Sequence, residues 1–371
     1  MSGGRKSSRW MLGLLGALAG LLLLSAGLWL WASGGALGEG ERSGEIVDFG
    51  VAPGALPSAE AGAAGVGTPA RLTLLTWNLA WARGTDPDPG HNPPVARARY
   101  EDHLRRMGAL IRRRGADIVL LQEIDFGAAR SHGLDELALL ARASGLRYGA
   151  RAVSWRARYV PYPYWPPREH YGRMLSGGAV LSRFPIRVNR VLLHAKPSTQ
   201  PWWYRPFYLW RYTQVVQLQR GDQRLWVVNN HLEAFDRVNR EAQAQTLLRV
   251  VGELAARLRE VADERLLVVG GDLNAVPAEA RQQAGFADAP EDDYRGDATL
   301  TTLRRLPGLV EIVAPARYVA EESRHFTFPT RAPTRRLDYL FVDRHARVER
   351  YEMLRTAAFS DHLPVVATLR W

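Results

Sequence analysis

The pattern of apolar and polar positions divides the chain into three parts. Residues 11–31 contain no ionisable side chain, and a helix rising about 1.5 Å per residue would let them span the roughly 30 Å hydrocarbon core of a bilayer. Residues 32–70 are rich in Gly, Ala, Pro and acids without sustained periodicity, which predicts a flexible linker. From residue 71 onward, apolar runs typical of strands alternate with helical patterns. We therefore expect one α/β domain over residues 71–371, behind an N-terminal apolar helix.

The domain begins with a β-α-β pattern. Arg71–Trp77 has the composition of a strand, residues 95–114 place apolar side chains at helical spacing and stop at Gly115, and Ile118–Leu121 is a short apolar run. A second strand, helix and strand follow, and two more strands are expected near the end of the chain: 224–230, 236–259, 265–269, 337–342 and 363–369. Alternation of this kind is typical of an α/β domain with mixed sheets.

The residues that flank the apolar segment indicate its orientation in a membrane. Trp10 precedes it and Trp29 and Trp31 lie at its end, where amphipathic rings favour the interface. Three basic residues lie within residues 1–10 and acids follow the segment, which predicts a cytoplasmic N-terminus, a single pass and a domain outside the cytoplasm. A signal peptide is the alternative, because residues 32–34 are small enough for cleavage, and the domain would then be secreted.

The amino-acid composition limits the kinds of active site that the chain can contain. The 371 residues carry 49 basic and 38 acidic side chains and no cysteine. Without cysteine, disulfides, thiolate metal sites and a cysteine nucleophile are excluded, so any metal must use oxygen or imidazole ligands. The positive surplus belongs to residues 71–371, which contain 45 basic and 33 acidic residues. It favours an anionic partner such as nucleic acid, anionic lipid or a phosphate ester.

Two stretches depart from the strand and helix patterns. Residues 154–171 and 196–212 concentrate Trp, Tyr and Phe together with Pro and Arg, which suits neither a buried strand nor a simple hydrophilic loop. We interpret both as insertions. Their aromatic rings could stack nucleic-acid bases, lie at a membrane interface, or pack on each other as a local cluster.

Unusual polar residues follow apolar strands at several places. In open α/β sheets, binding sites lie at the carboxyl ends of strands, where side chains can converge on a ligand. One such residue is commonly a turn or helix cap, but several at comparable strand ends predict a shared site. They are Asn78, Glu123, His231, Asp272, Asn274 and the pair Asp361–His362.

The chemistry of these residues is coherent. Glu123 and Asn78 offer hard oxygen ligands, a set suited to Mg²⁺ or Mn²⁺ and poor for zinc or copper. His362 can accept a proton near neutral pH, and a carboxylate such as Asp338 could orient its ring. The donors suited to hold a phosphoryl group are Asn274 and His231. Together these groups suit metal-assisted attack of water on a phosphate ester.

At these residues the chain resembles the endonuclease/exonuclease/phosphatase superfamily, which includes DNase I-like nucleases, abasic-site endonucleases, neutral sphingomyelinases and inositol-phosphate phosphatases. The similar segments follow the family's order across residues 71–371: TWNLAW (76–81), LLQEID (120–125), GGAVLSRFPI (177–186), NNHLEAF (229–235), GGDLNAVP (270–277), RRLDYLFV (335–342) and SDHLPVVATL (360–369). The resemblance implies a four-layer α/β sandwich, two mixed β-sheets flanked by helices, with the site at one end of the sandwich.

The resemblance also implies metal-site residues. Glu123 is similar in position to the family's principal metal ligand, and Asn78 to a second metal-site residue. Asp361 corresponds to the acid that accompanies the catalytic histidine and contributes to the metal environment. The expected cofactor is Mg²⁺, with Mn²⁺ as an alternative.

Catalytic roles follow from the same resemblance. His362 matches the catalytic histidine and Asp338 its paired acid, while Asp272 and Asn274 match the pair that holds the phosphate and supports the nucleophile or leaving group. His231 matches the second histidine of DNase-like and sphingomyelinase-like members. Family mechanisms differ on whether the histidine or the first acid of the DxN pair activates water, so both assignments remain open.

Three functions are compatible with the sequence. The first is a membrane-tethered, Mg²⁺-dependent phosphodiesterase outside the cytoplasm, acting on a phospholipid head group. The second is an extracytoplasmic nuclease acting on DNA or RNA, with the basic surface following the nucleic-acid backbone. The third is a non-catalytic module that binds phospholipid or envelope partners, which the complete set of acid, base and metal positions disfavours. No obligate protein partner is inferred. Gly178 stands where many family members have a polar residue, and Ala80 stands where some abasic-site enzymes have aspartate, which disfavours DNA repair.

Overall fold

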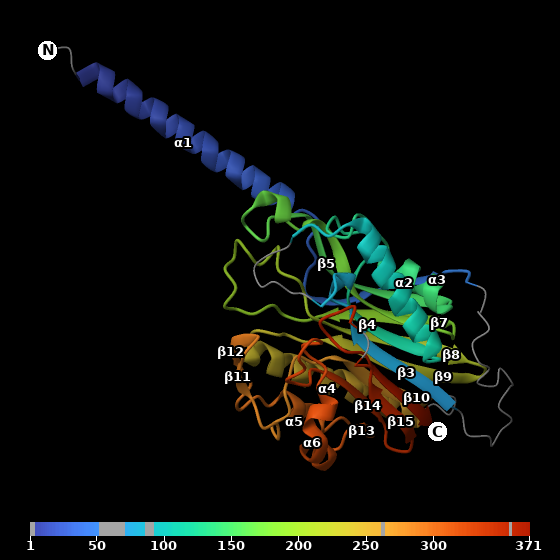
Figure 1. Ribbon diagram of the computed structural model, residues 1–371. Helices are drawn as coiled ribbons and strands as arrows, with labels where there is room; N and C mark the ends of the chain where they lie inside the picture. Colours follow the sequence, from blue (N-terminus) through green and yellow to red (C-terminus); the bar gives the residue numbers. More distant parts are fainter. Residues whose placement is uncertain (1–3, 52–70, 86–92, 261–263, 356–357) are drawn as a thin grey trace.

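The architecture is two packed β-sheets between layers of helices (Figure 1). The structure is a computed structural model, and its described residues are 4–51, 71–85, 93–260, 264–355 and 358–371. The first sheet has seven strands in the order β1 (Gly40–Ser43), β7 (Ile186–Leu193), β8 (Tyr212–Arg220), β9 (Gln223–His231), β10 (Glu264–Asp272), β14 (Asp338–Asp343) and β13 (Leu309–Glu311). The second has seven in the order β15 (Arg347–Met353), β16 (Val365–Arg370), β3 (Arg71–Asn78), β4 (Ile118–Asp125), β6 (Gly172–Ser182), β5 (Tyr148–Val160) and β2 (Glu45–Asp48).

Helices cover the outer face of each sheet, so the predicted four-layer sandwich is confirmed. Helices α2 (Arg97–Arg113) and α3 (Glu136–Ser144) bury apolar side chains against the second sheet. Helices α4 (Arg237–Glu260) and α5 (Thr299–Leu303) do the same against the first sheet. The remaining elements are α6 (Pro315–Glu321), the hairpin β11 (Ala284–Phe286) and β12 (Ala289–Asp293), and three 3-10 turns: η1 (Ala80–Ala82), η2 (Pro167–Glu169) and η3 (Glu322–His325).

The layer between the two sheets is an apolar core made by alternate residues of each strand. In β3, Leu72 and Leu74 face the other sheet, whereas Leu75 and Trp77 face the helices. This division follows from the two-residue repeat of a strand. Both sheets are mixed, because β3 pairs with β4 and β9 with β10 in parallel while the neighbouring strands are antiparallel.

Part of the predicted flexible linker is folded, which corrects our expectation for residues 32–70. Strand β1 pairs with β7 at the edge of the first sheet, and β2 pairs with β5 at the edge of the second. Phe49 then packs on the core under α3. Edge strands gain backbone hydrogen bonds without needing an apolar pattern, and charges at such edges are common, so composition concealed them. Residues 52–70 lie outside the described residues.

The first aromatic stretch is also only partly a loop. Residues 154–160 belong to β5, and only residues 161–171 leave the sheet, passing through η2. The second stretch, up to Arg211, lies in turns outside strands, as predicted. Alternate side chains of the end of β5 are buried against the second stretch, where Trp155 Nε1 donates to the Phe207 carbonyl at 2.9 Å.

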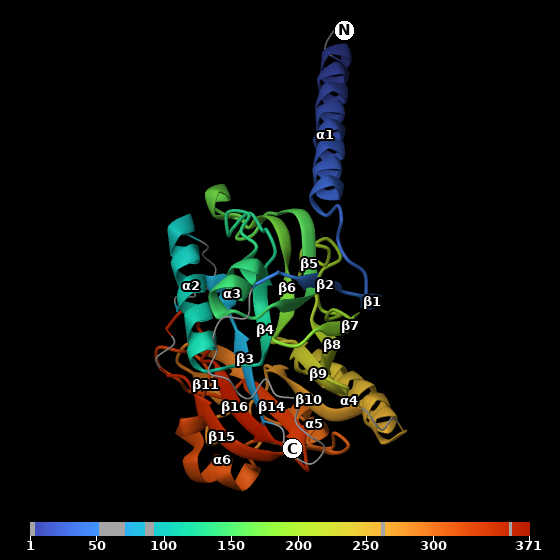
Figure 2. The ribbon, with the colours of Figure 1, turned by 90° about the vertical axis from the view of Figure 1, so that its right-hand side faces the viewer.

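Helix α1 (Gly4–Ala32) projects from the domain as a rod (Figures 1 and 2). Its segment Trp10–Ala32 is long and apolar enough to cross a membrane, and its large apolar side chains are exposed. Only its last turn touches the domain, at a group of aromatic residues that we call the aromatic junction. The junction comprises Trp29, Trp31, Trp155, Tyr159, Tyr162, Trp203, Tyr204 and Phe207.

Candidate active site

The predicted polar residues lie at the open end of the layer between the sheets. In β9, the inward row that begins with Leu225 and Val227 continues with Asn229 and His231. Alternate positions of one strand share a face, so a row that starts in the apolar core ends in polar side chains at the rim. We call the converging set the strand-end cluster: Asn78, Glu123, His231, Asp272, Asn274, Asp338, Asp361 and His362.

Strand register places three members of the cluster side by side. Asp272 at the end of β10 pairs with His231 on parallel β9 and with Asp338 on antiparallel β14. An antiparallel strand starts where its neighbour ends, so the first residue of β14 lies level with the last residue of β10. Residues far apart in sequence thus share one row across three strands.

Glu123 reaches the site through an irregularity in β4. The pairing of β4 with β6 shifts register between Leu121 and Ile124, and Glu123 has a φ of 51°. Such a bulge turns the following side chains relative to the sheet. A positive φ is costly for a residue with a side chain and is found at functional sites. The geometry aims the carboxylate at the cluster instead of at helices α2 and α3.

The glycine before Asp272 explains part of the GGDLN motif. Gly271 has a φ of +127°, and a Cβ there would lie 2.1 Å from the Asn230 carbonyl oxygen. Any side chain would push β10 away from β9. Glycine at this position therefore permits the strand pairing that brings Asp272 next to His231.

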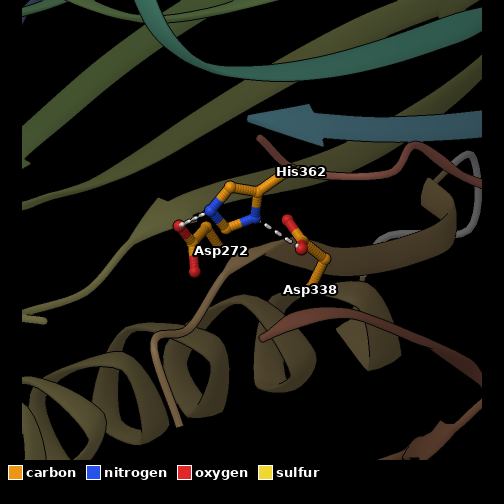
Figure 3. Close-up of side chains that lie close together, drawn as sticks. All are labelled: Asp272, Asp338 and His362. Carbon is orange, nitrogen blue, oxygen red and sulfur yellow. Dashed lines mark hydrogen bonds and ion pairs between the residues drawn. The ribbon is translucent and has the colours of Figure 1, made fainter. Parts of the chain in front are cut away.

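His362 lies between two carboxylates (Figure 3). Its Nδ1 is 2.8 Å from Asp338 Oδ2, and its Nε2 is 3.8 Å from Asp272 Oδ2. Burial acts to lower the pKa of His362, but the charges of Asp338 and Asp272 outweigh it and raise the pKa to about 10. The ring is therefore an imidazolium at neutral pH, with Asp338 holding its orientation.

Hydrogen bonds tie the His362 segment to the end of β3. The Ser360 hydroxyl donates to the Asn78 carbonyl at 2.7 Å and accepts from the His362 amide at 3.1 Å. The Trp77 indole donates to the His362 carbonyl at 2.9 Å. These bonds hold Asp361 and His362 against the strand that carries Asn78.

His231 occupies the other side of Asp272. Its Nε2 is 3.6 Å from Asp272 Oδ2 and 3.7 Å from Glu123 Oε1, and it also contacts the Arg211 guanidinium. Burial, followed by the charges of Arg211 and His362, lowers the pKa of His231 well below its usual value. The two histidines thus differ in charge, because His231 is neutral and His362 is protonated. Since a guanidinium can only donate hydrogen bonds, the Nε2 atom of His231 accepts from Arg211.

The two amides of the cluster position Asp272. Asn78 Nδ2 donates to Asp272 Oδ2 at 2.9 Å, and the Asn274 backbone amide donates to Asp272 Oδ1 at 3.0 Å. Burial nevertheless raises the pKa of Asp272 to about 6. The Asn274 side chain donates to the Leu232 carbonyl at 2.9 Å and keeps a second N–H for a ligand.

Glu123 and Asp361 form the part of the cluster that fits a divalent cation. Burial, with the charge of Asp361 next, raises the pKa of Glu123 to about 7. Burial raises the pKa of Asp361 as well. Two carboxylates that destabilise each other's charge would be relieved by a bound cation, and carboxylate oxygens suit Mg²⁺ or Mn²⁺.

The most compact group of acid and histidine side chains is a poorer candidate for the metal. Ligand atoms of Asp272, Asp338 and His362 lie within 4.8 Å of one another. Their closeness is explained by the ion pairs of a protonated imidazole, which has no free lone pair for a metal. This trio suits proton transfer and charge stabilisation.

Three residues at or below the cluster, Arg211, Gln122 and Asn229, were not identified as functional from the sequence. Arg211 is buried, contacts His231, and lies 3.7 Å from Glu233 Oε2 through its Nε. Below the cluster, Gln122 Nε2 donates to Asn229 Oδ1 at 2.7 Å and so connects the two sheets. Two features of the sequence could have identified these residues. Arg211 lies at the end of an aromatic stretch that also contains Arg, and Asn229 lies inside the NNH segment.

Comparisons with known proteins agree with the fold. The chain matches the Endonuclease/Exonuclease/phosphatase family over residues 75–362. An endonuclease/exonuclease/phosphatase family protein from Bacteroides thetaiotaomicron has a TM-score of 0.51 at 16% identity, covering 82% of this chain and 99% of that one. D. rerio TDP2 complexed with single strand DNA product has a TM-score of 0.51 at 16% identity, covering 81% and 98%. The similarity to these solved structures shows a common fold. No curated protein matches the sequence.

Proposed function

The chain belongs to the endonuclease/exonuclease/phosphatase family, whose members are metal-dependent phosphoesterases and nucleases, and on this premise we propose a narrower function. It is a Mg²⁺-dependent phosphodiesterase, anchored by α1, that hydrolyses phospholipid head groups outside the cytoplasm. The observation that carries the catalytic part is the convergence of Glu123, Asp272 and His362 on one site. His231 Nε2 lies within 3.7 Å of both Glu123 and Asp272, and His362 Nε2 is 3.8 Å from Asp272.

The side chains of the cluster have different roles in hydrolysis. Asp272 is the base that takes a proton from the attacking water, because His362 is already charged through its contacts with two carboxylates. The His362 imidazolium stabilises negative charge on the phosphoryl oxygens, and Asp338 preserves that charge. Asn274 holds the phosphoryl group through its remaining N–H. This division favours the acid of the DxN pair over the histidine as the base.

Glu123 and Asp361 would hold the cation, with Asn78 beside them. A divalent ion bound by these residues would act as a Lewis acid and neutralise negative charge on the phosphoryl oxygens. Asn78 contributes chiefly by fixing Asp272, since its amide nitrogen donates to that carboxylate and its Oδ1 accepts from the Ala80 backbone amide at 3.0 Å.

A membrane substrate is supported by the short path between α1 and the cluster. The segment after β7 packs its Trp203 and Phe207 against the last turn of α1, and four residues further along the chain Arg211 contacts His231. One loop therefore touches both the membrane helix and a cluster histidine. Anchoring raises the local concentration of the site at lipid head groups.

The decisive test compares substrates under identical metal conditions. The full chain, reconstituted in phospholipid vesicles, is assayed for release of phosphorylated head group with Mg²⁺, and for cleavage of plasmid DNA. We expect head-group release that depends on the cation and on His362. Cleavage of DNA without any head-group release would contradict the lipid assignment while leaving the phosphoesterase assignment intact.

A nuclease is the second candidate, favoured by the excess of basic residues over acidic residues in 71–371. Binding through phosphate contacts weakens steeply with salt because counterions are released. If the nuclease interpretation is right, plasmid cleavage falls by orders of magnitude between about 50 and 200 mM salt. Hydrolysis of a small aryl phosphodiester serves as the control, since it makes no extended backbone contacts.

A further inference from the structure

The base of α1 forms one wall of a cavity that the catalytic cluster does not use. The cavity has a volume of about 390 Å³, within the size range of ligand pockets. It lies between the last turn of α1, the end of β5 with the segment after it, and the loop between β7 and β8. Its lining is Leu28, Trp29, Trp31, Ala32, Tyr159, Val160, Pro161, Tyr162, Tyr164, Trp203, Tyr204 and Phe207.

Specific hydrogen bonds build this cavity. Trp29 Nε1 donates to the Trp203 carbonyl at 2.8 Å, so the helix is attached to the loop that forms the opposite wall. Beyond the helix, the Arg158 amide donates to the Gly34 carbonyl at 3.2 Å, and Arg156 Nε donates to the Gly35 carbonyl at 2.7 Å. The walls are thus held by contacts outside the cavity.

The chemistry of the lining selects an apolar ligand. Among the described residues, no charged side chain lines the cavity. A peptide or a nucleic-acid strand would leave polar groups unpaired there, at a cost in free energy, whereas a hydrocarbon chain has no such groups. Rings such as Tyr164 and Trp203 remain substantially exposed, with 45% of Trp203 accessible. Large exposed apolar patches mark binding sites.

The position of the cavity identifies the source of that hydrocarbon. Four lining residues belong to the final turn of the helix whose apolar surface is exposed from Trp10 onward. A spanning α1 places this turn at the interface, where Trp and Tyr concentrate and acyl chains begin. The cavity is therefore at the level of lipid chains, and its α1 residues belong to the end of the helix that meets the domain (Figure 2).

We propose that this cavity binds one acyl chain of a bilayer lipid. The proposal rests on the membrane anchoring in the proposed function, but not on the identity of the substrate. Occupancy would order the loop whose Trp203 and Phe207 line the cavity and whose Arg211 contacts His231.

Photolabelling tests the proposal directly. The full chain is reconstituted into phosphatidylcholine vesicles that contain a phosphatidylcholine with a diazirine in one acyl chain, irradiated, and mapped by peptide mass spectrometry. We expect labels on cavity-lining residues of both loops as well as on α1. Labels confined to α1 would overturn the proposal, because an acyl chain inside the cavity must also contact the loop residues that line it.

Two matched pairs of variants test whether the labelling of the loops occurs inside the cavity. Trp203→Ala removes one apolar wall and should reduce loop labelling roughly tenfold, whereas Trp165→Ala, which removes a 78% exposed ring outside the lining, should leave it unchanged. Ala32→Phe fills the cavity and should also abolish loop labelling, while Ala26→Phe places the same ring on the exposed face of α1.

Equal labelling within either pair would overturn the proposal. A variant that fails to fold is recognised by a changed thermal unfolding transition, so labelling is compared only between members of a pair that have the same transition. If turnover is absent in the wild type while the loops are labelled, the proposed function fails and the acyl-chain site stands. The two proposals are therefore separable.

Discussion

The strand-end cluster and the aromatic junction differ in the side chains that form them and in the elements that carry those side chains. The cluster consists of a few small polar side chains, placed by strand register at the rim of the core, as with Asp272 between His231 and Asp338. The junction consists of many large rings carried mainly by segments outside the sheets. Its contacts are ring edges, such as Trp29 against Phe207 with centroids 6.4 Å apart, and the indole hydrogen bonds of Trp29 and Trp155 to backbone carbonyls.

The difference indicates that the cluster determines the chemistry, whereas the junction determines where the domain is attached. Register allows little freedom, so the cluster can hold reacting groups in a fixed geometry, which catalysis needs. Rings on loops contribute apolar area and tolerate small shifts, which suits attachment to a bilayer. Changes in the cluster should therefore alter the rate on every substrate. Changes at the junction should alter the rate only on substrates presented by a membrane.

Removal of the divalent cation should have the largest effect. Chelation with EDTA should reduce hydrolysis of a soluble aryl phosphodiester to background, and Mg²⁺ or Mn²⁺ should restore it, because Glu123 and Asp361 are the carboxylates proposed to hold a charge-neutralising cation. Association with vesicles, measured by flotation, should not change. Loss of both properties on chelation would show that the two regions are not independent.

Loss of the imidazolium should come next. His362→Ala should reduce turnover of the soluble substrate and of vesicles alike by about 10²–10⁴-fold, since the ring is proposed to stabilise charge on the reacting phosphate. The matched control is His345→Ala, which removes an exposed histidine from the turn after β14. Steady-state kinetics on both substrates are the measurement, and unchanged turnover would remove His362 from the mechanism.

Arg211 connects the two regions, so its removal should have an intermediate effect. Arg211→Met leaves His231 without its guanidinium contact and should lower turnover of the soluble substrate by roughly 10- to 100-fold through misplacement of the ring. Arg205→Met, in the same loop with an exposed side chain, is the matched control. Equal rates for the two variants would show that the loop does not influence the cluster.

The smallest effect should come from the internal support of the loop. Lys196 Nζ donates to the carbonyls of Arg205 and Tyr208, each at 2.5 Å. Lys196→Met leaves both carbonyls without this donor and should lower the free energy of unfolding by about 1–3 kcal/mol. Urea denaturation measures the change. A several-fold loss of vesicle hydrolysis with normal turnover of the soluble substrate would locate the damage at the junction.

Much of the fold and of the candidate site could be predicted because both follow local rules. Apolar runs such as Ile118–Leu121 marked the inner strands, and polar residues at their ends, such as Asp272, marked the site. The edge strands β1 and β2 escaped prediction, since pairing through backbone groups leaves little trace in side-chain pattern. The β4 bulge at Glu123 and the ring charge on His362 also escaped, because both depend on neighbours distant in sequence.

By itself the sequence determined which segments were apolar, which residue types stood at the strand ends, and hence the family and the reaction class. Only the tertiary structure decided that His362 lies between two carboxylates while His231 faces Arg211, so that one ring is charged and the other neutral. It also decided that the second aromatic stretch joins α1 to the cluster. The physical reason is that charge state and packing depend on distances across the fold, which no local pattern encodes.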